Sequence, residues 1–298
     1  MLLVGPSDDF NVKLSEKLGS DLVPLDRRVF PDGEVCPRVL GDVRGEDVVL
    51  SMRMDAGSGS PNRYLMEVLF TLRNLREHMG AKFITLVIPY FPYARQDAIF
   101  RAGEPLSSKY VGELLEAAGA DAVVSVTVHL HRIGGFSELF ERAKALNVSG
   151  FKALAAKIKE LPLKDPFILG PDTESIHWAR ELAHYYGTEE FDAFRKERDV
   201  ATGEIKTYVK EIDLSGRDVV VVDDMVSTGG TMANAIKEAR RMGARMVVSA
   251  FVHPVLAPNA VDKILGAGAD VIVATDTIKW AGSKVSVVES IAEAIRGA

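Results

Sequence analysis

The sequence has very little cysteine, no excess of positive charge and no long apolar run. Its single cysteine, Cys36, cannot form an internal disulfide, which favours a reducing compartment. The formal net charge of −6 argues against a nucleic-acid partner, because binding a phosphate backbone needs a basic surface. The first residues show no basic segment leading into an apolar one, and no stretch approaches the length of a membrane span. We therefore predict a cytoplasmic protein with neither a nucleic-acid nor a membrane partner.

The chain does show a regular alternation of apolar strand-like runs and helical patterns. Its 298 residues suffice for two domains. Alternating strands and helices are typical of parallel sheets covered on both faces, so we predict an α/β fold. Predicted strands lie at 48–52, 83–89, 122–128, 167–169, 219–222, 246–252 and 271–274, with a last one at 285–288. Predicted helices lie at 63–79, 108–118, 151–160, 173–186, 231–242 and 258–265, with a last one at 289–296.

One stretch carries the strongest functional signal. A run of valines at 219–222 leads into Asp223 and Asp224, then into a hydroxyl- and glycine-rich loop at 227–231 and a predicted helix. A buried strand, a glycine loop and a helix N-terminus are the usual phosphate site of α/β folds, because N–H groups and the helix dipole favour an anion. The loop alone is equally compatible with an ordinary turn. The paired aspartates, which can accept hydrogen bonds from sugar hydroxyls, favour a phosphorylated sugar.

The chain also contains an internal repeat. Residues 42–50 resemble 213–221, and residues 118–124 resemble 267–273. Between these segments each copy passes through Gly-Ala to a strand that ends in a proline, Pro89 or Pro254. We therefore predict two copies of one α/β unit. The expected domains are residues 1–145 and 146–284, with 285–298 as a terminal strand and helix that packs back on the first domain.

The two copies differ where a function is expected. The first has Met52-Arg53-Met54-Asp55 and a glycine-serine stretch at 57–60 in place of the paired aspartates and their loop. It also has an insert of about 16 residues, which begins with Ala94-Arg95-Gln96-Asp97 just past a strand's carboxyl end. Ligands of α/β folds bind at such ends. The insert alone is compatible with a second ligand site or with a solvated loop.

Other polar residues are candidates with an ordinary alternative. Lys196 and Arg198 lie on one face of a predicted hairpin and could neutralise a polyphosphate, but charged edge strands are common. His129 and His131, at i and i+2 after the strand 122–128, could bind a metal or simply be hydrogen-bonded there. Asp172 precedes a predicted helix and could cap it. Residues 30–34 form a turn by composition.

Together these motifs resemble those of the ribose-phosphate pyrophosphokinases, over essentially the whole chain and in the same order. The segment 223–231 is shared with phosphoribosyltransferases in general. The resemblance is narrowed by Phe30-Pro31-Asp32-Gly33-Glu34, Tyr93-Ala94-Arg95-Gln96-Asp97 and Lys196-Glu197-Arg198. It implies two tandem phosphoribosyltransferase-like domains, each a mainly parallel sheet flanked by helices. It also implies transfer of the β,γ-pyrophosphoryl group of Mg²⁺-ATP to the 1-hydroxyl of ribose 5-phosphate, which yields AMP and phosphoribosyl pyrophosphate (PRPP).

The resemblance assigns roles by position. Lys196 and Arg198 would be the transition-state clamp on a mobile arm. The residues implied for ATP are Phe30, Asp32, Gly33, Glu34, Arg95, Gln96 and Asp97. Those implied for ribose 5-phosphate are Asp223, Asp224, Ser227, Thr228, Gly229, Gly230 and Thr231. The metal-nucleotide complex would be served by His131 and Asp172, with His129 as a further candidate. In this family the segment at 30–34 reaches adenine from a neighbouring subunit, which implies a homo-oligomer, a dimer or larger.

Several positions depart from the common family pattern. His129 replaces an aspartate, 132–136 is a shortened segment, Thr173-Glu174 replaces glycines, and Ser227 replaces a frequent aspartate. These departures indicate a divergent, archaeal-type branch. One alternative is a phosphoribosyltransferase that consumes PRPP, which explains neither the duplicated first half nor Lys196-Glu197-Arg198. The other is a non-catalytic, regulatory paralogue of the synthetase, which we would expect to have lost some of the charged residues.

Overall fold

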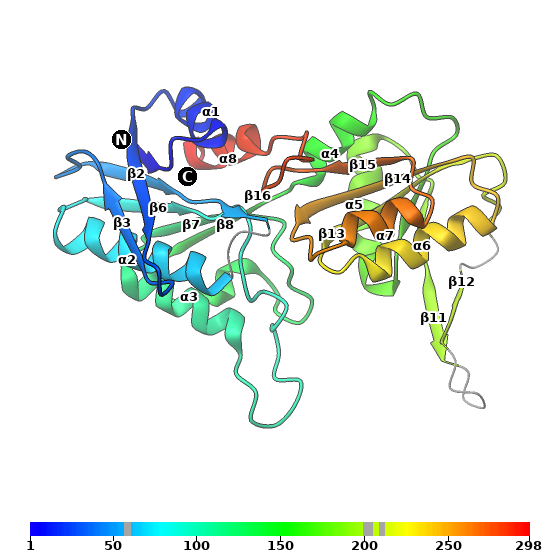
Figure 1. Ribbon diagram of the computed structural model, residues 1–298, viewed down its shortest axis with the longest axis horizontal. Coiled ribbons are helices and arrows are strands. Elements are labelled where there is room, and N and C mark those ends of the chain that lie inside the picture. Colours follow the sequence, from blue (N-terminus) through cyan, green and yellow to red (C-terminus); the bar gives the residue numbers. More distant parts are fainter. Residues whose placement is uncertain (57–60, 199–204, 209–211) are drawn as a thin grey trace. The chain divides into compact units, whose positions relative to one another are not determined.

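The computed structural model describes residues 1–56, 61–198, 205–208 and 212–298, which divide into two compact units. Unit 1 contains Met1–Ser149 and Val287–Ala298, and unit 2 contains Gly150–Ser286. Each unit has its own mainly parallel sheet with helices on both faces, so the predicted fold class is confirmed (Figure 1). No helix in the described ranges is long and apolar enough to cross a membrane.

The sheet of unit 1 has seven strands in the order β3-β2-β1-β4-β6-β7-β8. Its strands are β1 (Leu2–Gly5), β2 (Leu22–Val29), β3 (Val35–Val39), β4 (Asp47–Ser51), β6 (Phe83–Val87), β7 (Ala122–Val126) and β8 (Lys144–Val148). Strands β2 and β3 are antiparallel, and the other neighbouring pairs are parallel. Helices α1 (Asp9–Leu18) and α8 (Val288–Arg296) cover one face (Figure 1). Helices α2 (Pro61–Glu77) and α3 (Ser107–Ala118) cover the other.

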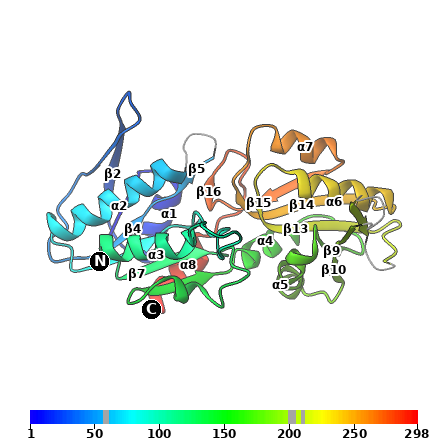
Figure 2. The same ribbon diagram turned by 90° about the horizontal axis from the view of Figure 1, so that it is seen from below.

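The sheet of unit 2 is parallel throughout and has the order β10-β9-β13-β14-β15. Its strands are β9 (Phe167–Gly170), β10 (Phe191–Ala193), β13 (Asp218–Val226), β14 (Met246–Pro254) and β15 (Val271–Ala274). Helices α4 (Phe151–Ile158) and α5 (Ile176–Tyr186) cover one face, and α6 (Gly230–Arg241) and α7 (Ala260–Gly266) cover the other (Figure 2). The valines of the central strand β13 are fully buried because helices lie on both sides of it.

Smaller elements complete the assignment. Strands β11 (Arg195–Arg198) and β12 (Ile205–Tyr208) pair antiparallel, which confirms the predicted hairpin. Two short strands are β5 (Met54–Asp55) in unit 1 and β16 (Ile278–Lys279) in unit 2. Two 3-10 turns are η1 (Phe136–Leu139) and η2 (Thr173–Ser175).

The internal repeat is present in the topology. The order β2-β1-β4-β6-β7 of unit 1 matches the order β10-β9-β13-β14-β15 of unit 2, strand for strand in chain sense. Each unit also has the same ion pair, Arg76–Asp121 in unit 1 and Arg240–Asp270 in unit 2. In both, the aspartate accepts a further hydrogen bond from a backbone N–H of the neighbouring strand. Two features at equivalent positions, one topological and one chemical, support a common origin of the halves.

The end of the chain differs from the sequence prediction. The predicted strand at 285–288 is wrong, because Val285 makes only an isolated bridge with Thr275 and α8 begins at Val288. Only Val288 of the predicted run belongs to the helix, where Val288 and Ile291 are buried at helical spacing. Helix α8 packs in unit 1, where Glu289 pairs with Lys17 of α1 at 2.5 Å. The predicted boundary between residues 145 and 146 falls inside β8, and unit 1 extends to Ser149.

Candidate functional site

The end of β13 brings carboxylates together at the carboxyl edge of the second sheet. Asp224 is 1% exposed and Asp223 is half-buried, and the Asp223 carboxylate accepts a hydrogen bond from the Asp224 N–H at 3.0 Å. Burial, together with the carboxylates of Asp224 and of Asp172 in the loop after β9, raises the pKa of Asp223 well above its usual range. Clustered carboxylates of this kind bind favourably to hydroxyl donors or to a cation, which would offset their repulsion.

The loop after β13 ends in a backbone geometry that requires glycine. Gly229 has φ 74°, in the left-handed region, and a Cβ there would lie 2.9 Å from the carbonyl oxygen of Ala260. Gly229 is the N-cap of α6 and has no side chain that could accept a hydrogen bond from the first N–H groups of the helix. The first N–H groups of α6 therefore point out of the helix, where its dipole favours an anion. Ser227, Thr228 and Thr231 add hydroxyl donors around this loop.

Asp172 has a structural role besides its place near Asp223. It is the N-cap of η2, where its carboxylate accepts from the Ser175 N–H at 3.3 Å and the Ser175 hydroxyl donates to the Asp172 carbonyl at 2.6 Å. Within the part of the chain that the structure describes, no group of three His, Cys, Asp or Glu side chains could hold a metal by itself. Mg²⁺ typically takes only one or two carboxylates and completes its shell with phosphate oxygens and water. One or two of the carboxylates of Asp172, Asp223 and Asp224, together with phosphate oxygens and water, would fit that kind of site.

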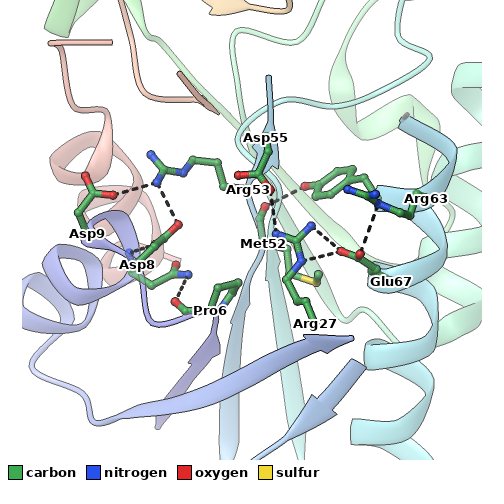
Figure 3. Close-up of polar contacts among 11 residues, drawn as sticks. Pro6, Asp8, Asp9, Arg27, Met52, Arg53, Asp55, Arg63 and Glu67 are labelled. Atoms are coloured by element: carbon green, nitrogen blue, oxygen red, sulfur yellow. Dashed lines mark hydrogen bonds and ion pairs between the residues drawn. The ribbon is translucent and has the colours of Figure 1, made fainter. Parts of the chain in front are cut away.

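The equivalent edge of the first sheet has the opposite charge arrangement. The repeat places Met52 and Arg53 at the positions of Asp223 and Asp224. The guanidinium of Arg53, which is 5% exposed, donates to Asp8 at 2.9 Å and to Asp9 at 3.0 Å (Figure 3).

A second group of ion pairs lies beside Arg53. Arg27 donates to Glu67, which is 1% exposed, at 2.6 Å and to Asp55 at 3.3 Å (Figure 3). The Tyr64 hydroxyl donates to the carbonyl of Met52 at 2.8 Å, and burial raises the pKa of that hydroxyl. At this edge of the sheet, unit 1 therefore has ion pairs between its own side chains, whereas unit 2 has a cluster of carboxylates. Sequence reasoning missed this network, although the alignment of Arg53 with Asp224 was a signal for it.

The insert of unit 1 is ordered by its own polar residues. Asp97 is 3% exposed and accepts hydrogen bonds from the N–H groups of His131 at 2.6 Å and Arg132 at 2.8 Å. Burial alone would raise the pKa of Asp97, but these N–H donors and the guanidinium of Arg132 lower it. The Gln96 side chain donates to the carbonyl of Ala98 at 3.1 Å and to Glu104 at 3.2 Å. Arg95 is exposed beside them.

The two histidines lie beyond the strand, which corrects the geometry predicted for them. Strand β7 ends at Val126, and Thr127 has φ 41°, so the chain leaves the sheet before His129. The argument that residues i and i+2 share a strand face is therefore wrong here. The rings of His129 and His131 nevertheless lie edge to face with centroids 4.3 Å apart, in the loop that Asp97 holds.

Residues 30–34 form the turn of the β2–β3 hairpin, which confirms the turn prediction. The Gly33 N–H donates to the Phe30 carbonyl at 2.9 Å, and Gly33 has φ 94°. The Asp32 carboxylate accepts from the Glu34 N–H at 3.1 Å, and the guanidinium of Arg28 lies 4.6 Å from the Phe30 ring centroid. Figure 2 shows this hairpin projecting from the sheet of unit 1. The side chains of Asp32 and Glu34 are exposed on this turn.

Three predicted features lie wholly or partly outside the described residues. The backbone of β11 pairs Lys196 with Thr207 and Arg198 with Ile205, but the side chains of Lys196 and Arg198 are not among those described. The glycine-serine stretch at 57–60 and the hairpin turn at 199–204 are likewise outside the description.

Two sheet units of one topology, one with carboxylates beside a strand–loop–helix anion site, define the class as tandem phosphoribosyltransferase-type domains. The comparisons agree with this class. A family model described as the N-terminal domain of ribose phosphate pyrophosphokinase matches residues 2–119, and one described as a phosphoribosyl transferase domain matches residues 145–289. A crystal structure of phosphoribosylpyrophosphate synthetase from Mycobacterium smegmatis matches with a TM-score of 0.85 at 28% identity, over 99% of this chain and 97% of that one.

Curated relatives narrow the class to a family. A ribose-phosphate pyrophosphokinase of Methanothermobacter thermautotrophicus is 38% identical over 291 residues, which are 97% of each chain. One from Corynebacterium efficiens is 33% identical over 273 residues, covering 89% of this chain and 81% of its own. The chain therefore belongs to the ribose-phosphate pyrophosphokinase family, as its motifs predicted.

Proposed function

We propose that the protein transfers the β,γ-pyrophosphoryl group of Mg²⁺-ATP to the 1-hydroxyl of ribose 5-phosphate and releases AMP and PRPP. Its place among the ribose-phosphate pyrophosphokinases supports this reaction. The assignment of the ribose 5-phosphate site rests on the geometry at the end of β13. There Asp223 and Asp224 lie directly before a loop whose Gly229 admits no side chain.

In this proposal unit 2 binds ribose 5-phosphate. The N–H groups and hydroxyls from Ser227 to Thr231 would bind the 5-phosphate, and the ribose hydroxyls would donate to Asp223 and Asp224. The raised pKa of Asp223 has a consequence for this binding. Hydroxyl donors or Mg²⁺ at these carboxylates favour the ionised form, so binding should release protons at a pH where Asp223 is partly protonated.

Unit 1 would bind the nucleotide. Arg95 and Gln96 would contact ATP, while Asp97 would act by holding the loop of His129 and His131, because its own oxygens accept the N–H groups of His131 and Arg132. Mg²⁺ would be held at the phosphates with His131 and Asp172, and it would supply charge neutralisation. Lys196 and Arg198 would add positive charge in the transition state. Phosphoryl-type transfer depends mainly on such positioning and charge.

The hairpin at 30–34 would contact adenine in another copy of the chain. Phe30, Asp32, Gly33 and Glu34 lie on a turn that projects from unit 1, which supports a homo-oligomer of two or more copies. We expect a cytoplasmic protein. Light scattering on the purified chain measures the oligomer directly, and a monomer at assay concentration would contradict the shared adenine site.

The test of the reaction uses ATP, ribose 5-phosphate and Mg²⁺. We expect AMP and PRPP in equal amounts, with label from the β and γ phosphates of ATP recovered in PRPP. ADP in place of AMP would mean transfer of a single phosphoryl group. A folded protein that forms no AMP at high concentration would refute the proposal. Asp223→Asn with Asp224→Asn is the inactive control.

Two other functions are compatible with parts of the sequence. The match of residues 2–119 to the N-terminal pyrophosphokinase domain argues against a phosphoribosyltransferase that only consumes PRPP. A non-catalytic paralogue is disfavoured because Lys196, Arg198, Asp223 and Asp224 are all retained. The same assay separates the three, since only the synthetase converts ribose 5-phosphate to PRPP.

A further inference from the structure

We infer that one segment, residues 255–263, aims the backbone N–H groups of the phosphate loop, and that Lys263 is a positioning residue for ribose 5-phosphate. This segment, called the connection below, runs from the end of β14 into the first turn of α7. This inference rests on the proposed function, because the loop from Ser227 to Thr231 is assigned to the 5-phosphate there. It adds a residue and a segment that none of the motifs contains.

Three successive carbonyl groups of the loop are bound by this one connection. The carbonyl of Val226 accepts from the Leu256 N–H at 2.9 Å, and that of Ser227 accepts from the Ala257 N–H at 2.9 Å. The next carbonyl, that of Thr228, accepts from the Lys263 ammonium at 3.4 Å. In an extended strand successive carbonyls alternate in direction, so three that turn to one segment mark a specific backbone arrangement.

The arrangement fixes where the N–H groups of the loop point. In a trans peptide the C=O and the following N–H point in opposite directions, and the structure has no cis peptide bonds in its described part. Holding the carbonyls of Val226, Ser227 and Thr228 therefore directs the N–H groups of Ser227, Thr228 and Gly229 away from the connection. Successive N–H groups on one side form an anion-binding concavity. The ammonium also polarises the Thr228–Gly229 peptide, which strengthens its N–H as a donor.

The connection is itself held in an unusual backbone conformation. Leu256 has φ 46° and Asn259 has φ 66°, although neither is a glycine. Such conformations persist only where the surroundings over-determine them, and they cluster at functional sites. The same segment forms the wall beside Gly229, since the carbonyl oxygen of Ala260 is the atom that a Cβ at Gly229 would meet at 2.9 Å.

Charge gives Lys263 a second reason to matter. Residues 223–236 contain two aspartates and neither lysine nor arginine, yet the proposed ligand there is a phosphate dianion. Lys263 brings a positive charge to this loop from outside it. Its side chain belongs to an exposed residue of α7, so replacing it removes the charge and the hydrogen bond without opening a cavity in the core.

The test compares three variants. Lys263→Met removes the ammonium and keeps the aliphatic stem, Lys263→Arg keeps the donor, and Lys237→Met removes an exposed lysine of α6 as the matched control. Calorimetry gives the dissociation constants of ribose 5-phosphate and of inorganic phosphate, and steady-state kinetics give KM for both substrates. We expect Lys263→Met to weaken both phosphate ligands by about 5- to 10-fold, the loss typical of one ordinary hydrogen bond, because the Lys263–Thr228 contact is long and exposed although one partner is charged. KM for ATP should not change, and Lys263→Arg should bind ribose 5-phosphate within about twofold of the unaltered protein.

The outcomes are distinguishable. If the unaltered protein binds ribose 5-phosphate and Lys263→Met binds it as well as Lys237→Met does, the inference is wrong and the proposed function stands. Equal weakening of ATP and ribose 5-phosphate by Lys263→Met would also overturn it, since that indicates a general structural effect. If the unaltered protein binds no ribose 5-phosphate, both the proposed function and this inference fail.

Discussion

Replacing Asp97 with asparagine should destabilise the loop that carries His131 and weaken ATP binding. Binding of ribose 5-phosphate should not change. The Asp97 carboxylate is 3% exposed and accepts two backbone N–H groups, at 2.6 and 2.8 Å, from the loop that carries His131. Both N–H groups bind one carboxylate oxygen, Oδ2, while the Arg132 guanidinium faces Oδ1 at 3.4 Å. Asparagine is nearly the same size and can keep both N–H contacts through its amide oxygen, but it has no charge and turns its NH₂ group towards the guanidinium. The variant therefore removes the charge and one acceptor without changing the volume of the site.

The size of the effect follows from these bonds. A hydrogen bond with a charged partner is worth roughly 1.5–3 kcal/mol net and a neutral one about 0.5–1.5 kcal/mol, so each of the two N–H bonds loses about 1–1.5 kcal/mol when its acceptor becomes neutral. We therefore expect Asp97→Asn to lower the free energy of unfolding of unit 1 by about 2–4 kcal/mol at neutral pH. Asp26→Asn, an exposed carboxylate of the same unit, should change it by less than about 0.5 kcal/mol.

The pH dependence has a definite sign. The folded-state pKa of Asp97 is lowered, so its stabilising effect is fully present above the pKa of the unfolded chain, about 3.9, and is lost as the pH falls through the folded value. Asp97→Asn cannot titrate at this position. The stability difference between the two proteins should therefore be constant near neutrality and shrink below about pH 4.

Amide hydrogen exchange and steady-state kinetics test whether Asp97 positions the histidine loop. Amide hydrogen exchange should be faster in the peptide that contains His131 and Arg132, and KM for ATP should rise while that for ribose 5-phosphate stays within about twofold. Unfolding is best followed locally, because a chain of two units need not unfold in two states. If Asp97→Asn matches Asp26→Asn in exchange and in KM for ATP, Asp97 does not position the histidine loop.

Three further variants test other parts of the structure. Arg53→Met should destabilise unit 1 by about 1–2 kcal/mol, measured by thermal unfolding, because the partly buried Asp8 carboxylate loses its ion pair while the exposed Asp9 carboxylate can be hydrated; an unchanged melting temperature would mean that the ion pairs are unimportant. Gly229→Ala should raise KM for ribose 5-phosphate at least tenfold, since its φ of 74° and the Ala260 carbonyl both oppose a side chain; normal affinity would refute the loop assignment. Lys196→Ala should lower kcat far more than it weakens ribose 5-phosphate binding, and equal losses would count against a transition-state role.

The internal repeat was predictable because short segments of the two halves are similar in sequence. Residues 42–50 and 213–221 align without gaps, and they become the equivalent strands β4 and β13 of two sheets with one topology. The glycine loop was predictable for a similar reason, because strand, loop and helix are adjacent in the chain. Local patterns specify local structure, and the repeat extended that information to the whole fold.

The parts that could not be predicted depend on contacts between distant segments. Arg53 binds Asp8 across 45 residues, and Asp97 binds the His131 N–H across 34 residues. Nothing in the local sequence distinguishes these aspartates from ligand-binding ones. The strand predicted at 285–288 is wrong because valine is common in strands, whereas these residues cross from one unit to the other: Val285 makes a bridge in unit 2, and Val288 begins α8 in unit 1.

The two copies solve one electrostatic problem in two ways. At the carboxyl edge of unit 2, burial and the nearby carboxylates of Asp224 and Asp172 raise the pKa of Asp223, and the repulsion between the carboxylates destabilises the ligand-free state. At the same edge of unit 1, Arg53 occupies the position of Asp224. Its positive charge is neutralised within the unit by the carboxylates of Asp8 and Asp9. A site that leaves its charge uncompensated gains more from a cation or a donor-rich sugar than one that is already neutralised. The difference between the copies is therefore itself an argument for placing the sugar in unit 2.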